Sequence, residues 1–348
     1  MLKNLCIRNY RSIHELRIEQ LSRINLISGE NNSGKTTLLE AVLMLSSGHP
    51  EIMLHPFVLR GMTSSNLPAN AIPSIYWAQV FPEHDPGSSI IRISADHNSI
   101  GPLGLTVSLA PDDIVRKTVG TSGDASTGDA FRMATLLASI VRGDETWERG
   151  IQSTEDEIRI QKRTQPVLFP AFEVSTSSGD PKNDATCLDL VKRQKQGHRV
   201  VEALNIIHQS LKSLEVISAT GEPMIWADVG YSELVPLPTV GEGMIRICRL
   251  AMGMVIARGG TLLIDEIENG IHHTMIADLW HFIYRTARDL DVQVFATTHS
   301  YECLQAAQDV HSDDLMLHRL EVGDAGHRCI TVHPEQLETA VLHNLEVR

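Results

Sequence analysis

A glycine-rich loop near the amino terminus carries the residues best suited to chemistry. The segment Gly29-Glu-Asn-Asn-Ser-Gly-Lys-Thr36 has the pattern G-x-x-x-x-G-K-[ST], between an apolar run at 24–28 and an uninterrupted helical run at 37–45. Its glycines let successive backbone N–H groups converge on a β-phosphate, and the following helix N-terminus adds partial positive charge. Lys35 is expected to reach the β- and γ-phosphates and the Thr36 hydroxyl to ligate Mg²⁺. The pattern predicts a nucleotide site formed by Gly29, Asn31, Asn32, Ser33, Gly34, Lys35, Thr36 and Thr37.

Two carboxylates follow a second apolar run. Asp265 and Glu266 come directly after Leu262-Leu263-Ile264, which is how a Walker B segment presents a magnesium ligand and a water-activating base at the carboxyl edge of a sheet. We expect Asp265 to hold Mg²⁺, directly or through water, and Glu266 to orient and deprotonate the attacking water. With Thr36 as the other metal ligand, ATP and Mg²⁺ are the expected cofactors.

A histidine follows the next predicted strand. His299 lies in Thr297-Thr298-His299-Ser300, after the apolar run 291–297. Because the carboxyl ends of parallel strands meet at one edge of a sheet, its imidazole can touch the γ-phosphate there. The alternative role is that of a turn residue before a helix capped by Ser300. The candidate catalytic residues are therefore Lys35, Glu266 and His299.

The composition excludes several classes of protein. The chain has 348 residues, 42% of them hydrophobic, which suits one large α/β domain or two modest ones. It contains no run of about eighteen apolar residues, and its first residues lack the apolar region of a signal peptide, so we expect a cytoplasmic protein with no membrane partner. The five cysteines are scattered and form no C-x-x-C pair, which argues against a disulfide framework and a zinc site.

The charge balance disfavours direct contact with nucleic acid. Thirty basic against 43 acidic residues give a formal net charge of −13, so the average surface repels a phosphate backbone. One basic cluster stands out, Lys192-Arg193-Gln-Lys195-Gln-Gly-His198-Arg199. It has no interleaved aromatic residues, which favours a solvated helix face over a DNA-binding patch. Any binding of nucleic acid is expected to be weak or to depend on a partner.

The first half of the chain predicts a β-rich lobe around the phosphate loop. Alternating apolar and polar residues at 2–8 and 14–19 predict an antiparallel hairpin that leads into the strand at 24–28. The helix after the loop is expected to stop at Ser46-Ser-Gly48. Further along, the pattern predicts a helix at 130–141, short strands at about 75–81, 89–95, 103–109, 156–163 and 166–174, and irregular segments at 51–74, 111–128 and 175–184.

The second half alternates strands and helices. Val200, Leu204, Ile207 and Leu211 recur at helical spacing and predict one amphipathic helix that ends near Leu214, too short for a coiled coil. From residue 214 onward we expect strands at 214–218, 224–229, 234–236, 261–265 and 291–297, helices at 243–258 and 273–290, and a closing strand, turn, strand and helix after Ser300. This alternation predicts a largely parallel sheet.

Together these elements predict an α/β protein with a P-loop NTPase head, a mostly parallel core sheet and an N-terminal antiparallel β-lobe. We interpret residues 1–348 as a single head. Within it, the expected parts are a nucleotide-binding core at 1–48 and 214–310, an inserted β-lobe and helical region at 50–213, and a C-terminal strand-strand-helix unit at 311–348.

Four motifs resemble those of a known family. The set GENNSGKTT, VGEGM, LLIDEIENGIHH and QVFATTHSYEC closely resembles the ABC/SMC-like ATPases of the OLD (overcoming lysogenization defect) group, AAA-type ATP-binding proteins often found in phage-defence modules. The similarity is specific at 1–48 and 222–310, extends to the end of the chain, and is poor through about 50–200. It implies an ABC-ATPase-like head and ATP hydrolysis.

The resemblance also implies a head-to-head homodimer or a higher oligomer. Two ATP molecules would lie between the phosphate loop of one copy and the signature motif of the other, for which the candidate is Val240-Gly-Glu-Gly-Met244. Gly241 stands where transport ABC proteins carry a serine, so backbone N–H groups of Gly241, Glu242 and Gly243 would contact the γ-phosphate. Asn269-Gly-Ile-His272 falls where the family's D-loop crosses the dimer interface. His272 and His273 are adjacent, and this disfavours a metal pair.

The effector and the biological role leave three hypotheses open. OLD nucleases carry a C-terminal metal-binding TOPRIM domain, whereas the residues after Ser300 are too few for one. The first hypothesis is therefore an ATPase that controls a separate effector protein, such as a TOPRIM-type nuclease in anti-phage defence. The second is a RecF-like repair ATPase that binds DNA directly, and the acidic charge disfavours it. The third is a non-hydrolysing, nucleotide-switched scaffold, which the presence of Asp265, Glu266 and His299 disfavours.

Overall fold

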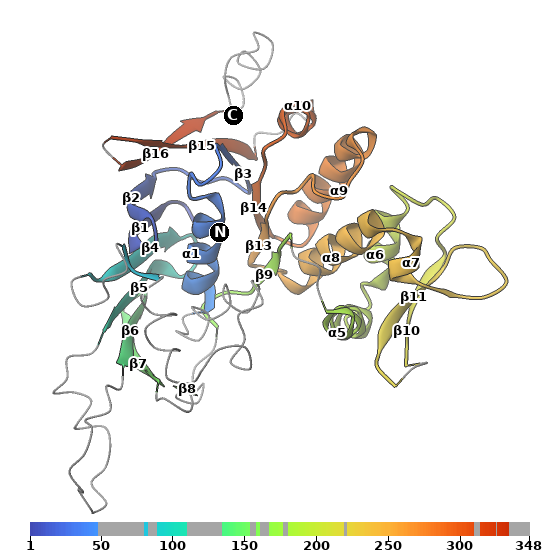
Figure 1. Cartoon of the computed structure of the whole chain (residues 1–348), viewed down its shortest axis with the longest axis horizontal. Helices are drawn as coiled ribbons and strands as arrows, with labels where there is room; N and C mark the ends of the chain where they lie inside the picture. Colours follow the sequence, from blue (N-terminus) through green and yellow to red (C-terminus); the bar gives the residue numbers. More distant parts are fainter. Residues whose placement is uncertain are drawn as a thin grey trace, which may run out of the picture.

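The computed structural model describes ten stretches of the chain: residues 1–47, 80–82, 89–109, 134–153, 158–160, 167–176, 180–218, 221–309, 314–324 and 326–333. Two sheets lie on either side of helix α1 (Lys35–Ser47), and further helices cover the outer face of the second sheet (Figure 1). In the described residues, no helix is long and apolar enough to cross a membrane.

The first sheet is antiparallel and follows the order β2-β1-β4-β5-β6-β7-β8. It is built from β1 (Leu5–Tyr10), β2 (Ile13–Ile18), β4 (Ile91–His97), β5 (Gly101–Leu109), β6 (Ala134–Arg142), β7 (Glu145–Ser153) and β8 (Ile158–Ile160). In β4 buried and exposed residues alternate strictly, so one face packs on α1 and the other meets solvent. This sheet forms the β-lobe beside the phosphate loop.

The second sheet has the order β16-β15-β3-β14-β13-β9 and is parallel except for β16. Its members are β3 (Ile24–Gly29), β9 (Ala171–Val174), β13 (Thr261–Ile264), β14 (Gln293–Thr297), β15 (Leu315–Gly323) and β16 (Gly326–Val332). The strands β3, β13 and β14 are buried along their whole length, as expected for a sheet covered on both faces. Their carboxyl ends meet at one edge, where ligands of such sheets bind.

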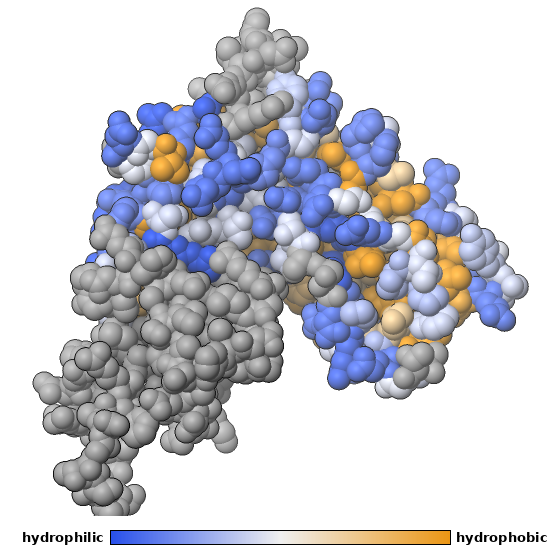
Figure 2. Space-filling model, in the orientation of Figure 1, coloured by the Kyte–Doolittle hydropathy of each residue, from blue (hydrophilic) through white to orange (hydrophobic). Residues whose placement is uncertain are grey.

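The outer face of this sheet is covered by a helical region. It contains α5 (Pro181–Arg193), α6 (Gly197–Leu204), α7 (Leu237–Val240), α8 (Glu242–Ile256), a 3-10 turn η4 (His273–Met275), α9 (Ile276–Asp289) and α10 (Tyr301–Asp309). A small antiparallel sheet of β10 (Ser213–Ile217), β11 (Met224–Asp228) and β12 (Val235–Pro236) packs against it. On the face drawn in Figure 2, hydrophobic residues gather over this helical region.

Most expected elements are confirmed with small shifts of their ends. These are the N-terminal hairpin, the strand and helix around the phosphate loop, the strands at 89–95 and 103–109, the elements from 224 to 297, and the paired strands after Ser300. The strand expected at 166–174 is shorter, since β9 begins at Ala171, and of the strand expected at 156–163 the structure describes only 158–160, which form β8. The irregular segments expected at 51–74 and 111–128 and the closing helix lie outside the described residues, as does most of the strand expected at 75–81, whose described end at 80–81 is not in a strand.

Several details of the secondary structure differ from the expectations. Residues 130–141 do not form a helix: β6 runs from Ala134 and pairs with β5 and β7, and Ala138 and Ile140 are buried at the spacing of a strand. The sequence of β7 was not expected to form a strand. The irregular segment at 175–184 ends early, because Asp180 accepts a hydrogen bond from the Lys182 N–H and begins α5.

The helix expected at 200–214 is also too long. α6 ends at Leu204, yet Leu211 and Leu214 are buried in the same core as Val200 and Leu204, from a turn and from β10. The apolar spacing correctly indicated which side chains face the core but not which element carries them. In addition, β10, β11 and β12 form their own sheet instead of joining the parallel one.

Candidate nucleotide-binding site

The phosphate loop joins β3 to α1 and requires glycine at its first position. Gly29 has φ +145°, and a Cβ atom there would lie 2.5 Å from the carbonyl oxygen of Leu320 on β15. Asn32 has φ 66°, a left-handed conformation that asparagine tolerates better than most residues. The loop therefore curls tightly between its neighbours, and its backbone groups face the carboxyl edge of the sheet.

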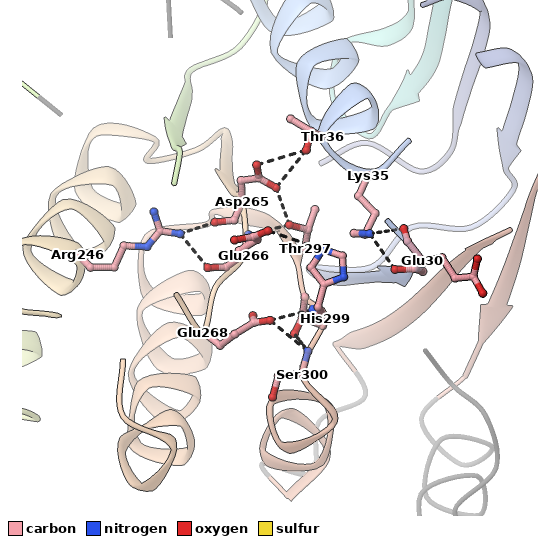
Figure 3. A network of polar contacts seen from close by, with 12 residues as sticks. Glu30, Lys35, Thr36, Arg246, Asp265, Glu266, Glu268, Thr297, His299 and Ser300 are labelled. Carbon is pink, nitrogen blue, oxygen red and sulfur yellow. Dashed lines mark hydrogen bonds and ion pairs between the residues drawn. The ribbon is translucent and has the colours of Figure 1, made fainter. Parts of the chain in front are cut away.

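Lys35 begins α1 and is almost fully buried, with 6% of its surface exposed. Its Nζ donates hydrogen bonds to the carbonyl oxygens of Gly29 at 2.8 Å and Glu30 at 2.7 Å (Figure 3). Burial lowers the pKa of Lys35, and the negative charges of Asp265, Glu266 and Glu268 oppose that shift. A buried ammonium in a glycine-rich loop at the start of a helix is suited to bind an anion such as phosphate.

Asp265 is held by hydroxyl groups from two other elements. The Thr297 hydroxyl at the end of β14 donates to Asp265 Oδ1 at 2.7 Å, and the Thr36 hydroxyl lies 3.3 Å from Asp265 Oδ2 (Figure 3). A carboxylate facing a threonine hydroxyl offers the hard oxygen ligands that Mg²⁺ prefers. Among the described residues no group of three or more His, Cys, Asp or Glu could hold a metal, so the pair fits an ion that completes its shell with phosphate oxygens and water.

Glu266 has a constrained backbone. It adopts φ 49°, which is unusual for a residue with a side chain, and its N–H donates to the Thr297 hydroxyl at 2.8 Å. Its carboxylate is 42% exposed, and Oε1 lies 3.7 Å from Nε2 of His299. The side chain is therefore free to accept a proton from a bound water molecule, while the backbone is fixed.

Arg246 fixes the backbone of Asp265 and Glu266 through hydrogen bonds from helix α8. It lies in α8, is 6% exposed, and its guanidinium donates to the carbonyl oxygens of Ser175, Asp265 and Glu266, the last at 3.0 Å. Burial lowers the pKa of Arg246 to about 10. Sequence reasoning missed this residue because its partners are main-chain carbonyls. The available signal was a charge among the buried apolar residues of α8.

The His299 segment is tied to the turn after β13. Glu268 Oε1 accepts hydrogen bonds from the N–H groups of His299 at 2.8 Å and Ser300 at 3.1 Å (Figure 3). Ser300 also begins α10 as expected, because its Oγ accepts from the Cys303 N–H at 3.1 Å. Capping by Ser300 and a position of His299 beside Glu266 are thus compatible. Glu268 was not singled out from the sequence.

One open cavity unites the candidate catalytic residues, the candidate metal ligands and most of the phosphate loop, whereas Gly29 and Ser33 line neighbouring hollows. It has about 1090 Å³ of empty space and is lined by Arg11, Ser12, Asn31, Asn32, Gly34, Lys35, Thr36, Thr37, Asp265, Glu266 and His299. All three candidate catalytic residues and both candidate metal ligands are in this set. Arg11 and Ser12, from the turn between β1 and β2, were not expected to line it.

The signature candidate lies away from this cavity. Gly241 precedes α8 with φ +149°, Glu242 is exposed, and a Cβ atom on Gly243 would lie 2.8 Å from the carbonyl oxygen of Gly270. Glu242, Asn269 and Gly270 line a second cavity of about 820 Å³. The structure thus places Gly241, Glu242 and Gly243 beside the predicted D-loop and does not bring them to the phosphate loop of their own chain.

Two other clusters noted in the sequence do not form sites. The rings of His272 and His273 lie 4.3 Å apart, and the Nδ1 of His272 pairs with the hydroxyl of Thr274. In the basic cluster, Lys192, Arg193 and Arg199 form ion pairs with Glu215, Asp189 and Asp289. These pairs neutralise much of the cluster's charge, in agreement with a solvated helix face.

Comparisons with known proteins place the chain in a family. Residues 122–304, just over half of the chain, match the family described as "AAA domain, putative AbiEii toxin, Type IV TA system". The chain belongs to this AAA-domain family. The match contains Asp265, Glu266 and His299, and a second match over residues 4–55, described as "AAA domain", contains the phosphate loop.

Relatives of this AAA-domain protein include nucleotide phosphatases and repair proteins. It is 22% identical over 352 residues to an "ATP/GTP phosphatase" of Helicobacter pylori, covering 92% of this chain and 91% of that protein. It is 29% identical to the "DNA replication and repair protein RecF" of Bifidobacterium longum over 52% of this chain and 43% of that protein. It is also 29% identical to the "DNA double-strand break repair Rad50 ATPase" of Archaeoglobus fulgidus over 44% of this chain and 16% of that protein.

Solved structures confirm the expected fold. An Smc head bound to the C-terminal winged-helix domain of ScpA has a TM-score of 0.52 at 13% identity, covering 96% of this chain and 98% of that one. The Smc head with an extended coiled coil from Pyrococcus furiosus has a TM-score of 0.51 at 10% identity, covering 99% of each chain. The AAA-domain protein therefore has the fold of an SMC-type ABC-ATPase head, with a mostly parallel sheet and an antiparallel lobe.

Proposed function

We propose that this AAA-domain protein is a Mg²⁺-dependent ATP hydrolase that works as a homodimer and controls a separate effector protein. The observation that carries the proposal is the cavity in which the phosphate loop, Asp265, Glu266 and His299 converge from three neighbouring strand ends. A phosphate-binding loop alone needs only affinity, whereas a carboxylate positioned as a base beside it is a feature of hydrolysis.

Each residue has a distinct task in this proposal. The loop N–H groups and the Lys35 ammonium bind the β- and γ-phosphates, and Thr36 and Asp265 hold Mg²⁺, which neutralises charge that develops on the phosphate oxygens. Glu266 orients the attacking water and takes its proton, and the fixed backbone of Glu266 limits how far that carboxylate can move. His299, which lines the same cavity beside Glu266, would contact the γ-phosphate.

The signature segment supports a head-to-head dimer. Gly241, Glu242 and Gly243 lie beside Asn269 and Gly270 and not in the cavity of their own chain. The start of α8 offers backbone N–H groups and the positive end of a helix dipole, which suits a γ-phosphate held by a second copy. ATP should then stabilise the closed dimer more than ADP does, because only ATP has the γ-phosphate.

The OLD-like hypothesis proposes a separate effector protein for this ATPase. A RecF-like role is the second candidate. The resemblance of the four motifs to OLD-group ATPases favours an ATPase that serves a separate effector, such as a TOPRIM-type nuclease in anti-phage defence. The partial matches to RecF favour direct action on DNA. The charge of −13 and the ion-paired basic cluster weigh against direct DNA binding and leave the effector role as the better-supported proposal.

Turnover of two variants tests the catalytic part. Lys35→Ala should abolish ATP binding. Glu266→Gln should bind ATP as the parent does but hydrolyse it about 10²- to 10⁴-fold more slowly, because only the base is lost. Calorimetry gives the affinities and phosphate release gives the rates. Equal rates for Glu266→Gln and the parent would remove Glu266 from its proposed role.

Sedimentation tests the dimer. Glu266→Gln with ATP should form a compact dimer, and the same protein with ADP should be looser or dissociated. Asn269→Arg, at an exposed position in the turn after β13, should weaken the ATP dimer, whereas Thr146→Arg, exposed on β7 of the antiparallel sheet, should not. An assembly state that is the same with both nucleotides would contradict nucleotide-driven closure.

A further inference from the structure

Glu268 holds the backbone that carries His299. Its Oε1 accepts from the N–H groups of both His299 and Ser300, so one carboxylate joins the turn after β13 to the segment after β14 (Figure 3). We propose that Glu268 is a positioning residue for hydrolysis, which fixes the His299 imidazole relative to Glu266. This inference rests on the proposed ATP hydrolysis and adds a residue that acts through another.

Helix capping does not account for this carboxylate. Within the residues that the structure describes, the cap of α10 is already made by Ser300, whose Oγ accepts from the Cys303 N–H. The Ser300 hydroxyl in turn donates to Glu302 Oε2 at 2.8 Å, and the Ser300 N–H has a second acceptor in Thr298 Oγ1 at 3.0 Å. Glu268 is the acceptor found for the N–H of His299 itself.

The orientation of the His299 side chain depends on these hydrogen bonds because packing does not fix it. Its imidazole is 36% exposed, and the 3.7 Å between its Nε2 and Glu266 Oε1 is too long for a hydrogen bond. The direction of the ring therefore depends on the backbone that carries it. Two charge-assisted hydrogen bonds to adjacent N–H groups fix that backbone more firmly than neutral bonds would.

The second carboxylate oxygen of Glu268 indicates that this side chain is held in place by its contact with the His299 segment. Oε2 is buried and has no hydrogen-bond partner among the residues that the structure describes. Leaving a buried acceptor unpaired destabilises the folded protein. Glu268 also acts on the site through its charge. Burial lowers the pKa values of Lys35 and Arg246, and the negative charge of Glu268 raises them in part. The carboxylate thus faces the site and makes its described hydrogen bonds only to the His299 segment.

Kinetics of matched variants test the proposal. Glu268→Ala should lower kcat by about 10- to 100-fold, the loss typical of a misplaced group, while the affinity for ATP stays within about twofold. Glu268→Gln keeps an acceptor oxygen and should recover most of the rate. Glu302→Ala removes a neighbouring carboxylate at the start of α10 without touching the N–H of His299 and should leave kcat unchanged.

A double-mutant cycle separates positioning from a general structural role. If Glu268 acts through His299, then Glu268→Ala should have no further effect on kcat in a protein that already carries His299→Ala. The amide resonance of His299 should shift in Glu268→Ala much more than in Glu302→Ala, because only Glu268 accepts from that N–H, and this readout needs no turnover. Fully additive losses, an unshifted His299 amide, or a parent-like kcat for Glu268→Ala would each overturn the positioning role. An unsubstituted protein that binds ATP without hydrolysing it would instead overturn the proposed function.

Discussion

Thr297 offers a sharp test of how the site is held together. Its hydroxyl donates to Asp265 Oδ1 at 2.7 Å and accepts from the Glu266 N–H at 2.8 Å, and the residue is fully buried at the end of β14. Thr297→Val keeps the shape of the side chain but removes this hydroxyl. Thr297→Ser keeps the hydroxyl and removes only a methyl group, so it is the matched control.

The structure allows an estimate of the difference in stability. A hydrogen bond to a charged group contributes about 1.5–3 kcal/mol, and a buried N–H left without an acceptor costs about 1–3 kcal/mol. Since the two effects overlap at one hydroxyl, we expect Thr297→Val to lower the free energy of unfolding by about 3 kcal/mol. Thr297→Ser should cost about 1 kcal/mol, the loss typical of one buried methyl group.

Urea unfolding without nucleotide, followed by the fluorescence of tryptophan, measures both variants; Trp280 is buried in the core. A second measurement concerns the metal. Loss of the group that orients Asp265 should raise the Mg²⁺ concentration for half-maximal turnover about 10- to 100-fold in Thr297→Val and much less in Thr297→Ser. Equal stabilities and equal Mg²⁺ requirements for the two variants would refute the role assigned to this hydroxyl.

His318, Gly29 and the basic cluster each give a further expected outcome. Burial lowers the pKa of His318 from 6.5 to about 4, so between those values the unfolded chain binds a proton that the folded chain excludes. The free energy of unfolding should therefore fall as pH drops through this window, by about 3 kcal/mol at its acid end. His318→Gln should remove this fall, as measured by urea unfolding at each pH. Gly29→Ala should lower the melting temperature more than Gly230→Ala, since both have positive φ but only the Cβ at 29 meets a backbone oxygen; equal shifts would count against the close approach. Charge reversal at Lys192, Arg193 and Lys195 should leave duplex DNA binding weak, roughly 10⁻⁴ to 10⁻⁶ M by fluorescence anisotropy at physiological salt, whereas tight binding that the reversal removes would favour the RecF-like candidate.

The residues that could be found from sequence are those that act through local pattern. The phosphate loop and the Asp265-Glu266 pair are short motifs whose geometry follows from the strand and helix beside them. Arg246 and Glu268 could not be assigned in this way, because their partners are backbone groups of other elements. Main-chain carbonyls and N–H groups are present at every position, so no residue type marks them.

The fold could be predicted where strands are buried on both faces and less well in the lobe. β3 and β13 are rich in isoleucine and leucine and are buried throughout, which indicates a parallel core. β6, by contrast, has a sequence compatible with a helix, and it is a strand because β5 and β7 supply hydrogen-bond partners on either side. Its pairing with β5 joins segments that lie far apart in sequence, which propensity alone does not reveal.

The position of β3 between β14 and β15 affects when the protein can acquire its activity during synthesis. The strand that precedes the phosphate loop is made long before either of its neighbours, and the Asn25 side chain donates to the Val294 carbonyl oxygen across 269 residues. Until β15 has left the ribosome, β3 has an open edge and Gly29 lacks the strand against which it packs. A nascent or truncated chain that lacks β14 and β15 should therefore bind nucleotide poorly, which confines any ATP-driven signal to chains in which both strands have been made.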